Sequence, residues 1–212
     1  MKPLTRHTGR GVVLDRNDVD TDQIVPAEFC KRLTKSGYAD ALFAGWRQDP
    51  AFVLNLPAGA QASILVAGHN FGTGSSREHA VWALRDWGFV AVFASSFGDI
   101  FRRNAGKNGL LAVELPPSAL AEVADRVRSD PRSEITVDLT RLEVRGAGTR
   151  HRFALDDRVR RLLMNGLDEI ALTLGNEDAI TAHEQARARW MPTTGPVSPA
   201  SSAPPAAEGS PR

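Results

Sequence analysis

Residues 68–79 of the chain are Gly-His-Asn-Phe-Gly-Thr-Gly-Ser-Ser-Arg-Glu-His, a glycine-rich turn set between two apolar segments. Residues 62–67, before the turn, are short, apolar and partly β-branched, which is typical of a buried strand. After the turn, apolar side chains recur at helical spacing, at Ala80, Ala83, Leu84 and Trp87. This spacing predicts a helix over residues 77–87 with one buried face, so the segment predicts a strand–turn–helix unit.

Strand-like and helix-like segments alternate along the rest of the chain. Short apolar or β-branched runs predict strands at residues 11–14, 52–56, 89–94, 110–115, 135–139 and 142–144, the last continuing toward Phe153. Helical patterns cover residues 99–107, 118–127, 157–165 and 177–190, with one or two helical turns over residues 38–46. Residues 15–26 are predicted to be a polar loop. Such alternation predicts the α/β fold class, with helices layered on a sheet.

The composition fits one folded domain followed by a tail. The chain has 212 residues, of which 42% are hydrophobic and 24% charged, enough for one packed core. From Met191 to Arg212, proline, serine, alanine and glycine dominate, and such a segment buries too little apolar surface to offset its ordering entropy. We therefore predict a folded domain over residues 1–190 and a disordered C-terminal tail over residues 191–212.

Charge and hydropathy argue against several classes of function. The formal net charge is +1 and no basic stripe with interleaved aromatic residues is present, so nucleic-acid binding is not predicted. The longest apolar runs, residues 64–67 and 89–94, are too short to span a bilayer, and the N-terminus lacks the apolar stretch of a signal peptide. The expected location is the cytoplasm, with no membrane partner.

The glycine-rich turn has the features of an anion site. Its glycines permit the positive φ angles of a tight turn, and the start of the following helix presents unpaired N–H groups. Arg77 adds a guanidinium suited to a carboxylate, with the hydroxyl of Ser75 at the centre. Two other interpretations stay open at this point. Ser75 and Glu78 are spaced as a capping box, and the glycines form an imperfect phosphate loop that lacks the third glycine of the dinucleotide motif.

Two further polar stretches flank this turn in the chain. Residues 18–26 are Asp-Val-Asp-Thr-Asp-Gln-Ile-Val-Pro, which alone suits a solvated turn or a weak calcium-like loop without the required glycine and final glutamate. Residues 95–109 are Ser-Ser-Phe-Gly-Asp-Ile-Phe-Arg-Arg-Asn-Ala-Gly-Lys-Asn-Gly, which alone suits an ordinary helix with a glycine C-cap. Neither stretch by itself indicates an activity.

Together, in this order and at these separations, the three stretches resemble the swivel domain of the aconitase superfamily, and most closely the family of isopropylmalate isomerase small subunits. The resemblance covers roughly residues 5–190. It implies a swivelling β/β/α three-layer domain. It also implies a hydro-lyase that converts 2-isopropylmalate to 3-isopropylmalate by dehydration and rehydration, in leucine biosynthesis.

The same resemblance implies a larger partner subunit, which carries a [4Fe–4S] cluster with one iron open to act as a Lewis acid. Clusters of this kind are held by several cysteine thiolates, and Cys30 is the one cysteine of this sequence. No cofactor or metal is therefore expected to be bound by this chain alone. The large subunit and the small-molecule substrate are its expected partners.

The resemblance also implies roles for individual residues. Ser75 matches the general base that removes a proton from the carbon next to a carboxylate, and nearby N–H groups and Arg77 would favour negative charge on its oxygen. Arg77 matches the arginine that binds a substrate carboxylate, and Ser76 matches its hydrogen-bonding neighbour. Asp22 matches an acidic residue that faces the site and takes part in catalysis.

A second basic contact is expected within residues 28–32, which stand where the family has a mobile substrate-selecting segment. Arg32 is the preferred contact for the second substrate carboxylate and Lys31 the close alternative. Phe29-Cys30 departs from the family's usual Tyr or Phe followed by Leu, and Thr73 stands where many relatives have cysteine. Because Lys31 and Arg32 could bind an additional substrate carboxylate, the small subunit of homoaconitase or of a methylmalate-type dehydratase stays the alternative.

Two functions of other classes also stay open. A stand-alone anion-binding module would bind phosphate ligands through residues 72–77 without any iron–sulfur partner. A purely structural subunit would leave its complex active when Ser75 is replaced by alanine. His69 and His79 are expected to be positioning or surface residues rather than acid–base groups.

Overall fold

A computed structural model describes residues 1–146, 148–188 and 190–192. Contacts divide the chain into two units, Met1–Leu174 and Gly175–Arg212. Of the predicted tail, residues 193–212 lie outside the described ranges. The disorder of the tail and the domain boundary at Met191 therefore stay predictions.

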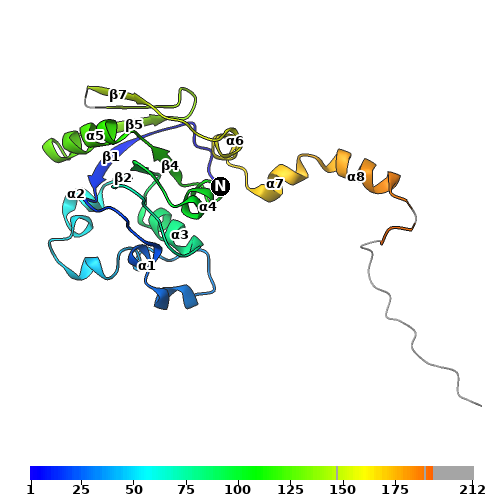
Figure 1. The fold of residues 1–212 in the computed structure, drawn as a ribbon, viewed down its shortest axis with the longest axis horizontal. Coiled ribbons are helices and arrows are strands. Elements are labelled where there is room, and N and C mark those ends of the chain that lie inside the picture. The colour runs from blue at the N-terminus through cyan, green and yellow to red at the C-terminus, as the bar shows by residue number, and fades with distance from the viewer. Residues whose placement is uncertain (147, 189, 193–212) are drawn as a thin grey trace, which may run out of the picture. The chain divides into compact units, whose positions relative to one another are not determined.

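Within the described part of the first unit, seven strands form one sheet, in the order β4-β3-β2-β1-β5-β6-β7. Their bounds are β1 (Arg6–Val13), β2 (Ile64–Val66), β3 (Ala91–Ala94), β4 (Leu111–Glu114), β5 (Glu134–Asp138), β6 (Glu143–Gly146) and β7 (Thr149–Arg152). Strands β1 to β4 pair in parallel, whereas β5 pairs antiparallel with β1 and continues through β6 and β7 as an antiparallel meander. The long strand β1 therefore joins a parallel half to an antiparallel half (Figure 1).

The helices of the first unit are α1 (Thr21–Ile24), α2 (Pro57–Ala60), α3 (Glu78–Trp87), α4 (Asp99–Lys107), α5 (Pro117–Ser129), α6 (Asp157–Asn165) and α7 (Glu169–Leu174). Three short 3₁₀ segments accompany them, η1 (Ala27–Lys31), η2 (Trp46–Gln48) and η3 (Val53–Asn55). The second unit contains α8 (Glu177–Ala186).

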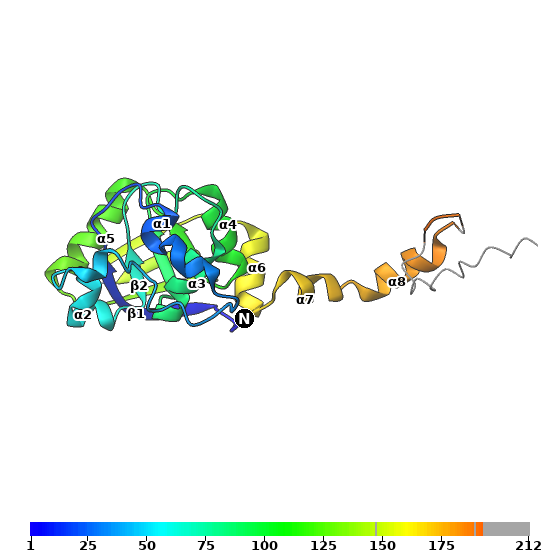
Figure 2. The same cartoon turned by 90° about the horizontal axis from the view of Figure 1, so that it is seen from below.

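Two hydrophobic cores separate three layers. The first core joins Leu65 of the parallel strands to Leu84 of α3 and to α1. The second core joins Phe93 of the parallel strands to Val137 and Val144 of the antiparallel strands, with α5 packed against it. Figure 1 shows α1 and α3 on one side of the strands and α5 on the other, and in Figure 2 α1 and α3 lie in front of the strands. The predicted α/β class and three-layer β/β/α arrangement are confirmed.

Local conformation explains where the predicted elements differ from the observed ones. Residues 38–46 form turns rather than a helix, because Phe43 has a φ of +47° and ends any helical run. Residues 52–56 contain the 3₁₀ segment η3 rather than a strand. The polar loop at residues 15–26 contains the short helix α1, and α7 was not predicted at all.

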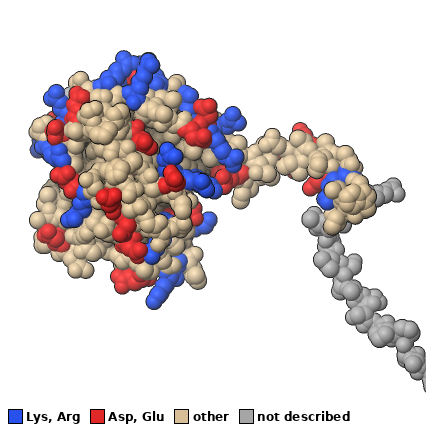
Figure 3. Space-filling view, in the orientation of Figure 1, with Lys and Arg blue, Asp and Glu red and all other residues tan. Residues whose placement is uncertain are grey.

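Figure 3 shows acidic and basic side chains interspersed over the visible face, without a large area of one sign. Within the described ranges, no helix combines the length and apolarity needed to cross a bilayer.

Gly72 marks the closest approach in the loop that follows β2. Its φ is +75°, and a Cβ atom added there would overlap the ring of Phe101 in α4. Gly88, which ends α3, also has a positive φ of +118°, but a Cβ atom there would meet nothing within 4 Å. Substitutions at Gly72 and Gly88 therefore distinguish the cost of a positive φ from the cost of steric overlap with a neighbouring side chain.

We expect Gly72→Ala to lower the free energy of unfolding by about 2–4 kcal/mol, because overlap with Phe101 adds to the backbone strain. The control Gly88→Ala carries the strain alone and should cost about 1 kcal/mol. Urea unfolding of the full chain followed by circular dichroism measures both. Equal losses in the two variants would contradict the importance of the Phe101 contact.

Candidate active site

The candidate site lies at the carboxyl ends of the parallel strands. Because β1, β2 and β3 run in the same direction, the segments that follow them all leave the sheet at the carboxyl ends of these strands. These segments are the acidic loop (residues 18–26), the serine loop (residues 68–77) and the third loop (residues 95–98). The three stretches that were singled out in the sequence therefore meet in space.

Backbone hydrogen bonds tie the serine loop to both neighbours. On one side, the Gly72 amide donates to the Val19 carbonyl of the acidic loop at 2.8 Å. On the other, the Phe71 amide donates to the Ser96 carbonyl of the third loop at 3.1 Å. Main-chain hydrogen bonds therefore hold the loop on both sides.

Thr21 fixes the backbone of the serine itself. Its side chain is buried, its hydroxyl donates to the Ser75 carbonyl at 3.0 Å, and its amide donates to the Thr73 carbonyl at 3.0 Å. Thr21 begins α1, whose N-terminus carries a capping box. The Asp20 carboxylate accepts from the Gln23 amide at 2.7 Å, and the Gln23 side chain accepts from the Asp20 amide at 3.0 Å.

Asp22 and Arg77, two of the predicted site residues, form an ion pair between the acidic loop and the serine loop. Nη1 of Arg77 donates to the carboxylate, and 22% of the Arg77 side chain stays exposed. A guanidinium carries five N–H donors in a planar fork. Arg77 is therefore oriented by Asp22 and retains donors for a second carboxylate.

Ser75 and Ser76 are exposed, and neither hydroxyl has a hydrogen-bond partner among the residues that the structure describes. The capping-box interpretation of Ser75 and Glu78 is wrong, because α3 begins at Glu78 and its N-cap is Arg77 without any side-chain cap. Arg77 therefore lies just before the helix and not in its first turn. The Ser75 hydroxyl therefore does not cap α3.

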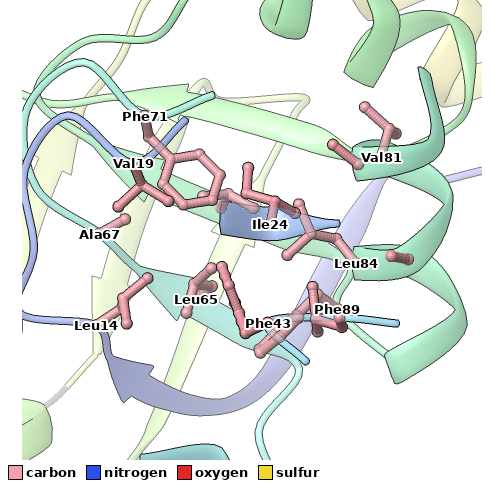
Figure 4. Close-up of a cluster of buried hydrophobic side chains, with 14 of the residues drawn as sticks. Leu14, Val19, Ile24, Phe43, Leu65, Ala67, Phe71, Val81, Leu84 and Phe89 are labelled. Atoms are coloured by element: carbon pink, nitrogen blue, oxygen red, sulfur yellow. The ribbon is translucent and has the colours of Figure 1, made fainter. Parts of the chain in front are cut away.

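An apolar floor supports the loops. Figure 4 shows Phe71 of the serine loop beside Val19 of the acidic loop, in one cluster with Leu65 of β2 and Ile24 of α1. The Phe71 ring also packs edge to face against Phe101, with ring centroids 5.3 Å apart. The loops thus turn their apolar side chains into the core, while Ser75 and Ser76 face solvent.

Arg32, the preferred second cation, is occupied within its own segment. Its guanidinium makes a bidentate pair with Asp40 at 2.6 and 2.8 Å and donates to the Gly37 carbonyl at 2.6 Å. It also lies over the rings of Phe29 and Tyr38, at 4.9 and 5.5 Å from their centroids. The hydrogen bonds from Arg32 hold the pKa of the Asp40 carboxyl below its usual range. Arg32 thereby closes residues 33–37 into a loop.

Lys31 is exposed, and its ammonium group has no partner in the part of the chain that the structure describes. The neighbouring Leu33 is fully exposed, at 101%. The two candidate cations therefore differ in availability: Arg32 is engaged by a carboxylate, and Lys31 is unpaired as far as the described residues show.

Comparison with known proteins identifies the family of the chain. Residues 1–118 match the aconitase C-terminal domain family, and residues 169–197 match the family of the C-terminal domain of the 3-isopropylmalate dehydratase small subunit. The chain is 59% identical to the 3-isopropylmalate dehydratase small subunit of Acidothermus cellulolyticus over 92% of its length and 98% of that relative. It is 57% identical to the subunit of the same name from Parafrankia sp., over 92% and 100% of the two chains.

The chain belongs to the 3-isopropylmalate dehydratase small-subunit family. The fold agrees with this assignment. A solved structure of 3-isopropylmalate dehydratase from Methanocaldococcus jannaschii superposes with a TM-score of 0.62 at 26% identity, over 84% of this chain and 99% of that one. The swivel-domain fold that the resemblance implied is therefore confirmed.

In this member of the small-subunit family, both histidines near the serine loop have structural contacts. Nδ1 of His69 lies 2.8 Å from the Ser96 hydroxyl. The His79 ring packs against Trp82 and Tyr38, with centroids 4.7 and 5.5 Å apart. That neither histidine acts as an acid–base group stays a prediction.

Three residues near the site were not found from the sequence. Thr21 pins Ser75, Asp40 holds Arg32, and Asn108 bonds to the first residue of α3. Asn108 could have been noticed within the third polar stretch, but its partner lies 30 residues away. Asp40 carried no signal, because it belongs to a segment expected to be helical.

The described residues of this small-subunit family member are a poor match for a metal ion or an iron–sulfur cluster. No group of three or more His, Cys, Asp or Glu side chains gathers in a metal-binding arrangement among the described residues. The single cysteine, Cys30, is partly buried against the first core. A cavity of about 1180 Å³ lies against α4 and α6, but none of the predicted site residues lines it.

We expect Asp40→Ala to increase the rate at which trypsin cleaves after Lys35, because loss of the Arg32 pair lets residues 33–37 open. Asp125→Ala is the matched control, since it removes another exposed carboxylate paired with an arginine, Arg128, at 2.9 Å. Mass spectrometry of timed digests measures cleavage at this one bond. Equal rates in both variants would show that Arg32 does not hold the loop.

Proposed function

We propose that the chain is the small subunit of a cytoplasmic hydro-lyase that interconverts 2-isopropylmalate and 3-isopropylmalate, by dehydration and rehydration, in leucine biosynthesis. The observation that carries the proposal is the exposed hydroxyl of Ser75, which has no partner among the described residues and lies two residues from the ion-paired Arg77, in a chain of this family. The high identity over nearly the whole length of named relatives supports the substrate class.

Ser75 acts as the general base in this proposal. A serine hydroxyl ionises with difficulty, so its alkoxide needs surroundings that favour negative charge. Arg77 supplies a fixed positive charge nearby, and the first amides of α3 have no partner within their own helix. Ser75 would take the proton from the substrate carbon next to the carboxylate, and return one during rehydration.

Arg77 binds the carboxylate that makes this carbon acidic. Neutralising the carboxylate favours the transient negative charge left when the proton departs. Asp22 keeps the guanidinium in one orientation, and Ser76 adds a hydroxyl beside it. We assign the second carboxylate to Lys31 rather than Arg32, because Arg32 already holds Asp40 and Lys31 is free.

The leaving hydroxyl also needs an acid. We assign this task to a [4Fe–4S] cluster in the large subunit, because one cysteine cannot supply the several thiolates that such clusters use. The exposure of Ser75 and Ser76 supports an arrangement in which a partner chain completes the site. This chain thus provides the base and the carboxylate contacts.

The free cation Lys31 also favours a second candidate, the small subunit of a related hydro-lyase whose substrate carries a longer carboxylated arm. An anaerobic assay distinguishes the two. The chain is tested alone and with a cluster-bearing large subunit, on 3-isopropylmalate and on homologated and methylated hydroxy-diacids. Isopropylmaleate formed only by the mixture supports the first proposal. No turnover of 3-isopropylmalate, with the cluster intact, would overturn it.

Ser75→Ala should lower kcat of the assembled enzyme by a factor on the order of 10²–10⁴, as is typical when a general base is lost. Assembly with the large subunit should be unchanged, as judged by gel filtration. Ser129→Ala, at the end of α5, is the control and should keep full activity. A fully active Ser75→Ala enzyme would favour a purely structural subunit.

Arg77→Lys should raise KM for 3-isopropylmalate by about tenfold and change kcat less, because an ammonium cannot replace the planar fork that binds a carboxylate while Asp22 holds it. Steady-state kinetics at constant ionic strength measure both constants. An unchanged KM would remove Arg77 from the substrate contacts.

A further inference from the structure

Both ends of helix α4 contact the segment that runs from the serine loop into α3. At the start of α4, the Gly98 amide donates to the Phe71 carbonyl at 2.9 Å, and the Phe101 ring lies against Gly72. At the other end, Asn108, the C-cap residue, reaches the first residue of α3. The segment that carries Ser75 and Arg77 is therefore held before and after its polar residues by one rigid element.

The Asn108 side chain makes three hydrogen bonds within the described residues. Its Nδ2 donates to the Glu78 carboxylate at 2.6 Å and to the Asn104 carbonyl at 2.9 Å, and its Oδ1 accepts from the Trp82 indole at 3.0 Å. Among the described residues, Asn108 is the hydrogen-bond partner of the Glu78 side chain. An amide suits this position because it donates to one partner and accepts from another.

Glu78 is the residue directly after Arg77. Its carboxylate is half-buried at the start of α3, where the helix dipole already favours negative charge. Without this donor, the Glu78 carboxylate would be free to turn toward the neighbouring residue Arg77, the group that is needed for a substrate carboxylate. It would also place an additional negative charge beside an anionic substrate.

We propose that Asn108 is a positioning residue, which holds the Glu78 carboxylate away from Arg77 and so keeps the guanidinium available to the substrate. The inference rests on the proposed role of Arg77, and it adds a residue that does not touch the substrate. A hydrogen bond to a charged group is strong enough to fix such a rotamer.

Asn108→Asp tests the proposal with almost no change of shape. The new carboxylate still accepts from Trp82, but it repels Glu78 instead of donating to it. In the complex with the large subunit, KM for 3-isopropylmalate should rise by about tenfold, with kcat changed by less than about threefold. A loss confined to kcat, or none, would overturn the proposal.

Asn108→Asp combined with Glu78→Gln reverses donor and acceptor. The amide introduced at position 78 can donate to the carboxylate introduced at position 108, so the bond is restored without a free carboxylate next to Arg77. KM of the double variant should return to within about threefold of the original value, and Glu78→Gln alone should stay close to it. A double variant that is no better than Asn108→Asp would show that this hydrogen bond is not the cause.

Asn165→Asp is the matched control. Asn165 ends α6 and also donates through Nδ2 to a carbonyl four residues back, that of Arg161, at 2.9 Å. The control therefore loses the same local bond at a helix end, and its KM should be unchanged. Equal effects on KM at positions 108 and 165 would show that Asn108 acts only through its bond at the helix end and not through Glu78.

Hydrogen exchange of the chain by itself gives a readout without activity. Amides of residues 74–79 should exchange faster in Asn108→Asp, return to the original rate in the double variant, and stay unchanged in Asn165→Asp. Normal turnover of 3-isopropylmalate by the unmodified complex tests the proposed function separately. If the unmodified complex does not turn over 3-isopropylmalate but the exchange rates change as expected, the proposed substrate is wrong. The contact between Asn108 and Glu78 then stays supported.

Discussion

The site depends on main-chain contact between three loops at one edge of a parallel sheet. The serine loop donates to the acidic loop through Gly72 and to the third loop through Phe71. These bonds require the backbone at Gly72 to pass against the ring of Phe101, where a Cβ atom would overlap. Backbone atoms and one ring therefore fix the middle of the serine loop, and the Thr21 hydroxyl adds a bond to the Ser75 carbonyl.

Side-chain charges then divide into those that are fixed and those that are left free. Asp22 orients Arg77, Asp40 holds Arg32, and Asn108 holds Glu78. Exposed ion pairs contribute little to stability, so their value lies in orientation rather than in folding energy. Among the described residues, the groups that stay available are the Ser75 hydroxyl, the remaining donors of Arg77 and the Lys31 ammonium.

Much of the fold was accessible from the sequence because its patterns are local. Residues 99–107 and 157–165 were predicted as helices and are α4 and α6, and three of the buried apolar runs are β2, β3 and β4. The failures are also local in origin. Phe43 has a positive φ that no periodicity reveals, and α1 is created by the bonds between Asp20 and Gln23 inside a segment that looked like a loop.

The sequence by itself determined the alternation of strands and helices, the family, and the residue types of the site. Each of these can be recognised from short stretches of consecutive residues. The tertiary structure alone decided how those side chains are paired. Sequence spacing allowed Ser75 to cap a helix and Arg32 to be free, and neither is so. Asp22 meets Arg77 across 55 positions and Asn108 meets Glu78 across 30. Contacts at such separations follow from how helices and loops pack on the sheet, which no short pattern contains.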